Sequence, residues 1–139
     1  MARILALDIG DVRVGVAISD MSQKIASPLC IINACDIKTN SKAFRAVLED
    51  WEPEYIVVGL PKSMDGTENS QASKIRDIAN TISANTGLEI VFVDERLSSM
   101  EAKTYMRECG ISERDMRGKL DSVAASIFLQ AYLESKNTD

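Results

Sequence analysis

An acidic residue, Asp8, interrupts the apolar run Ile4–Ile9, which otherwise has the composition of a strand buried on both faces. Removing an unpaired carboxylate from water is costly, so a buried acid is normally paired, protonated or bound to a metal ion. Gly10 and a short turn follow, and apolar residues then alternate from Val14 to Ile18. This pattern predicts a hairpin whose first strand carries a carboxylate near its end. Asp8 could equally be an ordinary turn aspartate that accepts hydrogen bonds from backbone amides.

Further acids follow later apolar segments. Asp94 and Glu95 come directly after a short apolar run, and Asp121 precedes the small pair Ala124 and Ala125. We expect Asp121 in the first turn of the last helix, where the helix dipole favours a negative charge and small residues allow a close approach to the sheet. Each acid alone also has a plainer interpretation, as a turn residue or as a first-turn helix charge.

The rest of the composition limits the chemistry that these acids could perform. The chain contains no histidine, which excludes histidine triads, histidine metal ligands and a histidine general base. Clustered carboxylates repel one another and raise one another's pKa unless a cation joins them. Oxygen ligands alone suit Mg²⁺ or Mn²⁺. Two such ions, about 4 Å apart, can activate water and stabilise the leaving oxygen in phosphodiester cleavage.

The elements that must position these acids are predicted from the spacing of apolar residues. The first third contains three strand patterns joined by short turns, which predicts an antiparallel meander because short turns cannot join parallel strands. Helical and strand patterns then alternate. The expected strands are Arg3–Ile9, Arg13–Ser19, Pro28–Asn33, Tyr55–Gly59 and Glu89–Val93, and the expected helices contain Phe44–Trp51, Ala72–Ile82, Ser98–Cys109 and Leu120–Leu133. The polar stretch 111–117 is expected to be mobile.

This order predicts an α/β fold with one five-stranded mixed sheet, in which an antiparallel three-strand meander is joined by two parallel strands and helices cover both faces. Ligands of such sheets gather at the carboxyl ends of the strands, so the acids after the first and last strands are expected at one edge. A chain of 139 residues fits a single domain, 1–139, with a tail at 134–139 that is expected to fray.

The overall composition indicates an ordinary globular protein, with 45% apolar and 27% charged residues. No apolar run approaches the roughly 20 residues that span a bilayer, and no signal peptide is evident. Three cysteines without zinc-like spacing are expected to be reduced thiols, which predicts a cytoplasmic protein without a membrane partner: Cys30, Cys35 and Cys109. The net charge of −5 argues against strong nonspecific nucleic-acid binding through bulk charge, although a local basic patch can act against an acidic background.

Four segments together resemble the YqgF/RuvX family, in the same order and over nearly the whole chain. They are ALDIGDVRVGVAISD (6–20), VVGLPKSMDGTE (57–68), VDERLSS (93–99) and KLDSVAASIFLQAYL (119–133). The resemblance implies a ribonuclease H-like fold, similar to Holliday junction resolvases. It also implies a metal-dependent endonuclease that hydrolyses phosphodiester bonds in structured nucleic acid, with 5′-end maturation of pre-16S rRNA in ribosome biogenesis as the expected role.

Carried over by position, the resemblance implies that the catalytic acids, which also bind Mg²⁺ or Mn²⁺ (two ions expected), are Asp8, Glu95 and Asp121. It implies nucleic-acid contacts for Arg13, Arg96 and, as a weaker candidate, Lys119. Arginine suits bidentate phosphate contact, although an arginine beside an acid is more often an ion pair. In the related fold the strand Tyr55–Gly59 would separate Asp8 from Glu95 by two spacings of nearly 5 Å each. Whether Asp94 or Glu95 is the ligand therefore stays open.

Two further acids, Asp20 and Asp65, match motif positions and are expected to be turn residues. Other functions also stay open. A Holliday junction resolvase acting on DNA would favour a two-fold homodimer. A noncatalytic nucleic-acid or transcription-associated binding module would fit the acidic balance and the missing acid at Gly59. The DIG motif of the hairpin is similar to the phosphate loop of actin-like ATPases and sugar kinases, which makes nucleotide binding a further alternative.

Overall fold

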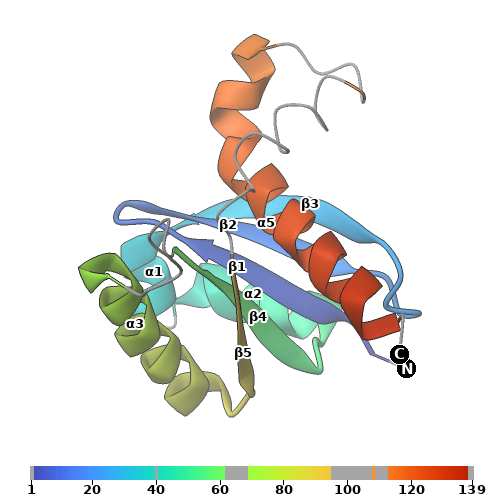
Figure 1. The fold of residues 1–139 in the computed structure, drawn as a ribbon. Coiled ribbons are helices and arrows are strands. Elements are labelled where there is room, and N and C mark those ends of the chain that lie inside the picture. Colours follow the sequence, from blue (N-terminus) through green and yellow to red (C-terminus); the bar gives the residue numbers. More distant parts are fainter. Residues whose placement is uncertain (1, 40, 62–68, 95–107, 109–112, 138–139) are drawn as a thin grey trace.

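One mixed sheet of five strands, in the order β3-β2-β1-β4-β5, forms the centre of the molecule in a computed structural model (Figure 1). The structure describes residues 2–39, 41–61, 69–94, 108 and 113–137 and, within the last helix, the side chains from residue 122 to residue 136. The strands are β1 (Ile4–Ile9), β2 (Arg13–Ser19), β3 (Ala26–Asn33), β4 (Tyr55–Leu60) and β5 (Ile90–Asp94). β1, β2 and β3 pair antiparallel, whereas β4 pairs parallel with β1 and with β5. The predicted mixed sheet is thus confirmed.

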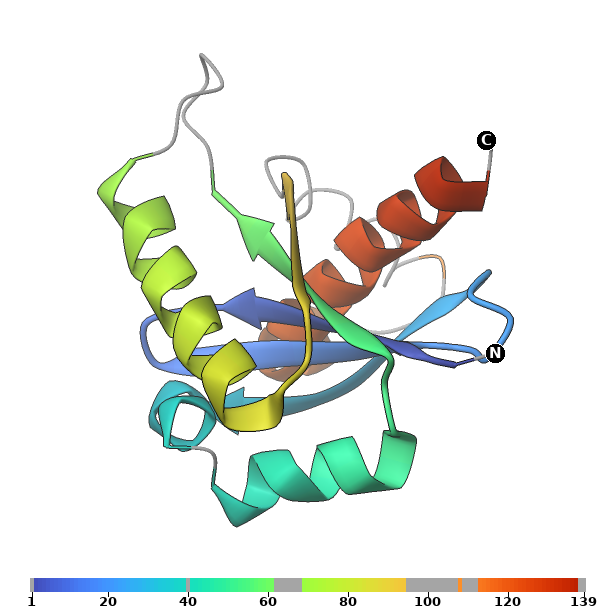
Figure 2. The ribbon, with the colours of Figure 1, turned by 90° about the horizontal axis from the view of Figure 1, so that it is seen from below.

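Helices cover both faces of this sheet (Figures 1 and 2). One face packs against α1 (Ala34–Lys38), α2 (Lys42–Trp51) and α3 (Ser70–Thr86), and the other packs against α5 (Glu113–Asn137). The two amphipathic helices α2 and α3 and the fully apolar strand β4 follow from the patterns of the sequence. Helix α3 begins at Asn69, whose side chain accepts a hydrogen bond from the amide of Ala72, and ends at Gly87 in the left-handed conformation.

Alternate side chains of β1 belong to two different hydrophobic cores. Leu5, Leu7 and Ile9 pack with α1, α2 and α3, whereas Ile4 and Ala6 pack beneath α5. Because successive side chains of a strand point to opposite faces, Asp8 continues the row of Ile4 and Ala6. The acid of the central strand therefore lies on the side of the sheet that α5 covers.

The sequence predictions were wrong at several element boundaries. The short helix α1 was not predicted, and β3 begins at Ala26, two residues before the expected Pro28. Helix α5 begins at Glu113 and continues to Asn137, so residues 113–117 are helical. Gly118 disfavours a helix, but the surrounding Glu, Arg, Met and Lys residues favour one. Apart from Glu108, which is helical, the expected helix at 98–109 lies outside the described residues.

The N-terminal end of the sheet is held by a hydrogen-bonded group that we call the clasp: Gln23, Tyr55, Tyr132 and Lys136. The hydroxyl groups of Tyr55 and Tyr132 lie 2.8 Å apart, and Lys136 donates to the side-chain oxygen of Gln23. Gln23 also donates to the carbonyl oxygen of Ala2 over 2.7 Å. Burial, followed by the hydrogen bond to Tyr55, raises the pKa of Tyr132 to about 12. The clasp fastens the end of α5 to the start of the sheet.

Two further expectations concern cysteines and membrane segments. Cys30 and Cys35 are free thiols, as expected, and Cys109 lies outside the described residues. No helix within the described part of the chain is long and apolar enough to cross a membrane.

Candidate active site

Asp8 is the next-to-last residue of β1, and its side chain is half-buried on the α5 side of the sheet. Gly15 of β2 lies directly opposite Asp8. The register of β1 and β4 pairs Leu7 with Val58, so its continuation by one residue places Gly59 beside Asp8 on the other flank. Glycine has no side chain, so the carboxylate is bordered on both strands by backbone alone. Both glycines are themselves buried, so Asp8 is flanked within the sheet by covered backbone.

The hairpin turn after Asp8 is tight and fixed in place. The amide of Gly10 donates to the carbonyl oxygen of Arg13 over 2.9 Å, and a Cβ atom at Gly10 would lie only 2.8 Å from that oxygen. Only glycine fits this close approach. The tip is also joined to α1, because the amide of Ala34 donates to the carbonyl oxygen of Val12 over 2.8 Å.

A cavity of about 260 Å³ opens at this turn, and we call it the hairpin cavity. It is lined by Asp8, Gly10, Asp11, Val12 and Arg13. Arg13 is exposed, and Val12 is 73% exposed despite being apolar. Sequence reasoning missed Asp11 and Val12 as lining residues, although their position between Asp8 and Arg13 in the same turn was a signal for them. The cavity combines a carboxylate with a guanidinium group at the carboxyl end of the central strand.

Asp94 was expected to follow the strand but is the last residue of β5, and the register of the sheet relates it to Asp8. Strand β4 lies between β1 and β5, as expected, and Gly59 pairs with Val93. Val93 packs on the α5 side, so the alternation of β5 places Asp94 on the opposite face from Asp8. Asp94 therefore does not share a face of the sheet with Asp8. Glu95 and Arg96 lie outside the described residues.

The remaining predicted residues, Lys119 and Asp121, lie in α5, of which only the backbone is described there. Asp121 is the ninth residue of α5, so the expectation of a first-turn position was wrong and the helix N-terminus does not act on it. From Tyr132, which bonds Tyr55 at the start of the sheet, α5 reaches back about 16 Å to position 121. β1 spans about 13 Å from Ile4 to Asp8. The two lengths are similar, so α5 is long enough for residue 121 to reach the carboxyl end of β1.

Of the three acids predicted to hold a divalent cation, the structure describes the side chain of Asp8 alone. The described side chains contain no group of three or more acids and cysteines that could hold a metal ion, and two of the three predicted ligands are outside that set. The chemistry of the donor that is described does fit, because Asp8 offers hard oxygen atoms beside open space. Completing such a site would require oxygen atoms from other elements.

Asp20 is a turn residue, as expected. Its carboxylate accepts hydrogen bonds from the Ser22 hydroxyl and from the amides of Lys24 and Ile25. These bonds, that of Ser22 first, lower the pKa of Asp20 to about 2. Asp65 lies outside the described residues.

Comparison with known proteins decides the family. A family model described as "RuvX: Holliday junction resolvase" matches residues 2–135. The chain belongs to the RuvX family. Among curated relatives, a protein of Fusobacterium nucleatum subsp. nucleatum is 43% identical over 98% of this chain and 99% of its own length. One of Escherichia coli O157:H7 is 38% identical over 94% and 95%, respectively. Both are named "Putative pre-16S rRNA nuclease".

Solved structures show which fold the RuvX family chain shares. Thermus thermophilus RuvC in complex with a Holliday junction substrate matches with a TM-score of 0.58 and 13% identity, over 99% of this chain and 96% of that one. Fowlpox virus resolvase with Holliday junction DNA matches with a TM-score of 0.59 and 16% identity, over 96% and 98%. At such identities the likeness concerns the fold, which is ribonuclease H-like, as predicted.

Proposed function

We propose that this chain is a metal-dependent endonuclease that hydrolyses phosphodiester bonds in structured RNA, with the 5′ end of pre-16S rRNA as its substrate in ribosome biogenesis. The observation that carries the proposal is Asp8, half-buried between two glycine positions at the carboxyl end of the central strand. Membership in the RuvX family and relatives named as pre-16S rRNA nucleases support it. A nuclease with this substrate would act in the cytoplasm.

We assign the cation to Asp8, Glu95 and Asp121. Glu95 follows Val93 by two positions, the spacing that keeps strand side chains on one face, whereas Asp94 belongs to the opposite face. Position 121 precedes Ala125 by four residues and Phe128 by seven, and both of these pack against the sheet. We infer from this spacing that 121 belongs to the sheet-facing stripe of α5. The three acids would therefore approach one point from β1, β5 and α5.

The bound cation, Mg²⁺ or Mn²⁺, would stabilise negative charge on the phosphate oxygens and lower the pKa of a water molecule. The chain's own residues orient the substrate around it. Arg13, exposed at the rim of the hairpin cavity, would donate to a phosphate, and Arg96 and Lys119 are proposed as further backbone contacts. The use of two ions is part of the proposal, and titration calorimetry with Mn²⁺ would count them.

The test of this proposal is the Asp8→Asn variant. Loss of the carboxylate should reduce cleavage of precursor RNA by more than about 100-fold, the upper range for loss of an outer-shell partner of a metal. Without metal, the unfolding midpoint should stay unchanged or rise, because repulsion among the acids is relieved. Asp20→Asn is the matched control and should cleave normally, since Asp20 lies at the opposite end of the sheet. Unchanged cleavage by Asp8→Asn would remove Asp8 from the mechanism.

The alternative substrate is branched DNA, which the description of the family model favours. A panel of precursor RNA, duplex RNA and four-way DNA junctions, assayed with Mg²⁺ and Mn²⁺, separates the two. Preferential cleavage of the junction, together with a dimer in light scattering, would support a resolvase. Binding to both substrates without cleavage of either would indicate a noncatalytic binding module.

A further inference from the structure

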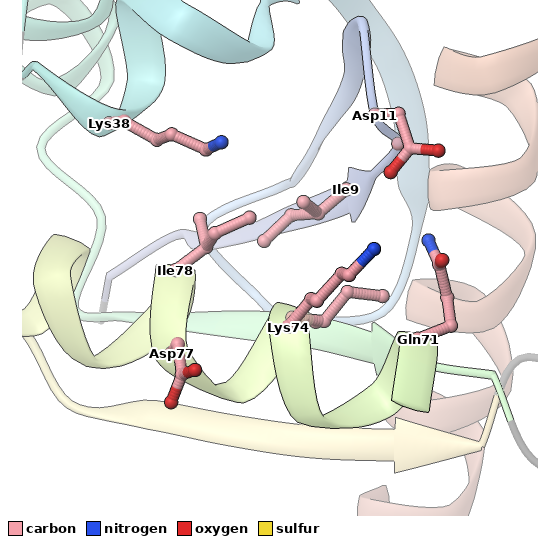
Figure 3. Close-up of a pocket in the computed structure, with 9 residues that line it drawn as sticks. Ile9, Asp11, Lys38, Gln71, Lys74, Asp77 and Ile78 are labelled. Atoms are coloured by element: carbon pink, nitrogen blue, oxygen red, sulfur yellow. The ribbon is translucent and has the colours of Figure 1, made fainter. Parts of the chain in front are cut away.

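A second cavity, of about 230 Å³, opens on the other side of the hairpin tip, between the tip, α1 and α3 (Figure 3). We call it the lysine pocket. It is lined by Ile9, Gly10, Asp11, Lys38, Gln71, Lys74, Ile75, Asp77 and Ile78. These residues come from three elements that are far apart in the sequence. Apart from Ile9 and Gly10 of the DIG motif, none of them was singled out by the sequence motifs as a binding residue.

Two ammonium groups dominate the lysine pocket. Lys38 is the last residue of α1 and Lys74 lies in the second turn of α3, and in Figure 3 both amines extend into the space between these helices. Neither lysine forms an ion pair or hydrogen bond with another described residue. The carboxylate of Asp77 points away from them (Figure 3). Two ammonium groups at one cavity would attract an anion. The carboxylate of Asp11 lines the same pocket.

The packing around the lysine pocket fixes the spacing of the elements that carry these two lysines. Ile9 and Ile75 are buried in the core at the base of the pocket, so the hairpin and α3 are packed together there. Helix α1 is joined to the hairpin tip by the bond from the Ala34 amide to the Val12 carbonyl. The half-buried Gln71 adds an amide that can donate to an oxygen ligand.

We propose that the lysine pocket binds a backbone phosphate of the nucleic acid, and that the bound strand passes around the hairpin tip from the hairpin cavity. Gly10 and Asp11 line both cavities, so the two are adjacent. Phosphate contacts position a nucleic acid without reading its sequence, and lysine serves well as a compact positive charge for them. The proposal rests on the proposed function, and it offers the substrate two lysine ammonium groups on an otherwise acidic chain.

Asp11 provides a prediction that is opposite in sign to that for the lysines. It is the carboxylate at the shared rim of the two cavities, and it would repel a strand that crosses the tip. Replacement of Asp11 by Asn should therefore strengthen binding, whereas replacement of the lysines should weaken it. A purely structural role for these exposed residues would produce neither change.

The test uses the full chain carrying Asp8→Asn, so that binding is measured without cleavage. Fluorescence anisotropy with a labelled precursor RNA over a series of KCl concentrations gives the affinity and its salt dependence. Lys38→Ala with Lys74→Ala should weaken binding about tenfold and lower the slope of log affinity against log salt by about one. Lys42→Ala, an exposed lysine of α2 outside the pocket, is the matched control and should change neither quantity. Thermal unfolding checks that each variant is folded.

The possible outcomes separate this proposal from the proposed function. The lysine pocket is supported as a phosphate site if only the double lysine variant loses RNA affinity and shows a smaller slope of log affinity against log salt. The Asp11→Asn variant should at the same time gain RNA affinity. If the double lysine variant binds RNA as tightly as Lys42→Ala, the lysine pocket is not a phosphate site. Cleavage by the wild type would then still support the proposed nuclease. Absence of any RNA binding by the wild type overturns both. If titrated ATP binds the parent and not the double lysine variant while RNA binding is equal, the pocket takes a nucleotide and the proposal is wrong.

Discussion

The two ends of the central strand β1 are built in opposite ways. At its N-terminal end, the clasp joins Tyr55 and Tyr132 through their hydroxyl groups and Gln23 to Lys136. At its carboxyl end, Asp8 lies beside Gly15 and, by continuation of the register, Gly59, and a cavity opens on each side of the hairpin tip. One end joins polar groups in a hydrogen-bonded network, and the other has charged side chains at the edges of two cavities. The two cavities thus lie where β1 ends, at the edge where ligands of such sheets generally bind.

The largest effect on stability and cleavage is expected when the tight turn at the carboxyl end of β1 is altered. In Gly10→Ala the new Cβ would lie 2.8 Å from the Arg13 carbonyl oxygen, so the turn must shift. We expect a loss of about 1–3 kcal/mol in the free energy of unfolding. Cleavage should fall by up to about 100-fold, because a displacement of about 1 Å can misplace a catalytic group. Urea unfolding and a cleavage assay measure the two effects.

The matched control for that turn is Gly87→Ala, at the end of α3. Gly87 has a φ of +74°, and a Cβ atom there meets nothing within 4 Å. The left-handed conformation should cost about 1 kcal/mol, with no effect on cleavage. Equal cleavage by the Gly10 and Gly87 variants would show that the turn does not position the site.

A substitution in the clasp should change the stability of the fold and leave cleavage unchanged. Tyr132→Phe removes the hydroxyl pair with Tyr55 and should lower the free energy of unfolding by about 1 kcal/mol, with cleavage unchanged. The pKa of Tyr132 is raised from 10.0 to about 12, so its contribution is fully present below pH 10 and is lost as the pH rises towards 12. The wild type and the variant should therefore converge in unfolding midpoint over that range. A cleavage defect would instead connect the two ends of β1.

The smallest effect is expected at Asp20, in the exposed turn near the clasp. The pKa of this carboxyl is lowered from 3.8 to about 2 by hydrogen bonds, of which that from Ser22 is the largest contribution. Its stabilising effect is present above pH 3.8 and is lost as the pH falls towards 2. Asp20→Asn should thus lower the unfolding midpoint slightly at neutral pH and match the wild type near pH 2. A constant difference across this range would exclude the carboxylate as its cause.

Sequence patterns predicted the sheet well and the surface features less well. The meander and the place of β4 follow from short turns and apolar runs, whose physical basis is local. Helix α1 has only five residues, too few for a periodic pattern, and the true start of α5 was hidden by Gly118 and polar neighbours. Asp8 could be singled out from the sequence because burying a carboxylate in an apolar strand costs free energy. Lys38 and Lys74 carry no such local anomaly, and only the packing of α1 and α3 brings them to one pocket.

The side chain of Gln23 links the two ends of the described chain. It donates to the carbonyl oxygen of Ala2 and accepts from Lys136, so the first and last described segments converge on one residue. A peptide linker of about five residues, each spanning at most about 3.5 Å, would join them into a ring. Circularisation of this kind would reduce the conformational entropy of the unfolded chain and would leave the hairpin cavity, at the far end of β1, unobstructed.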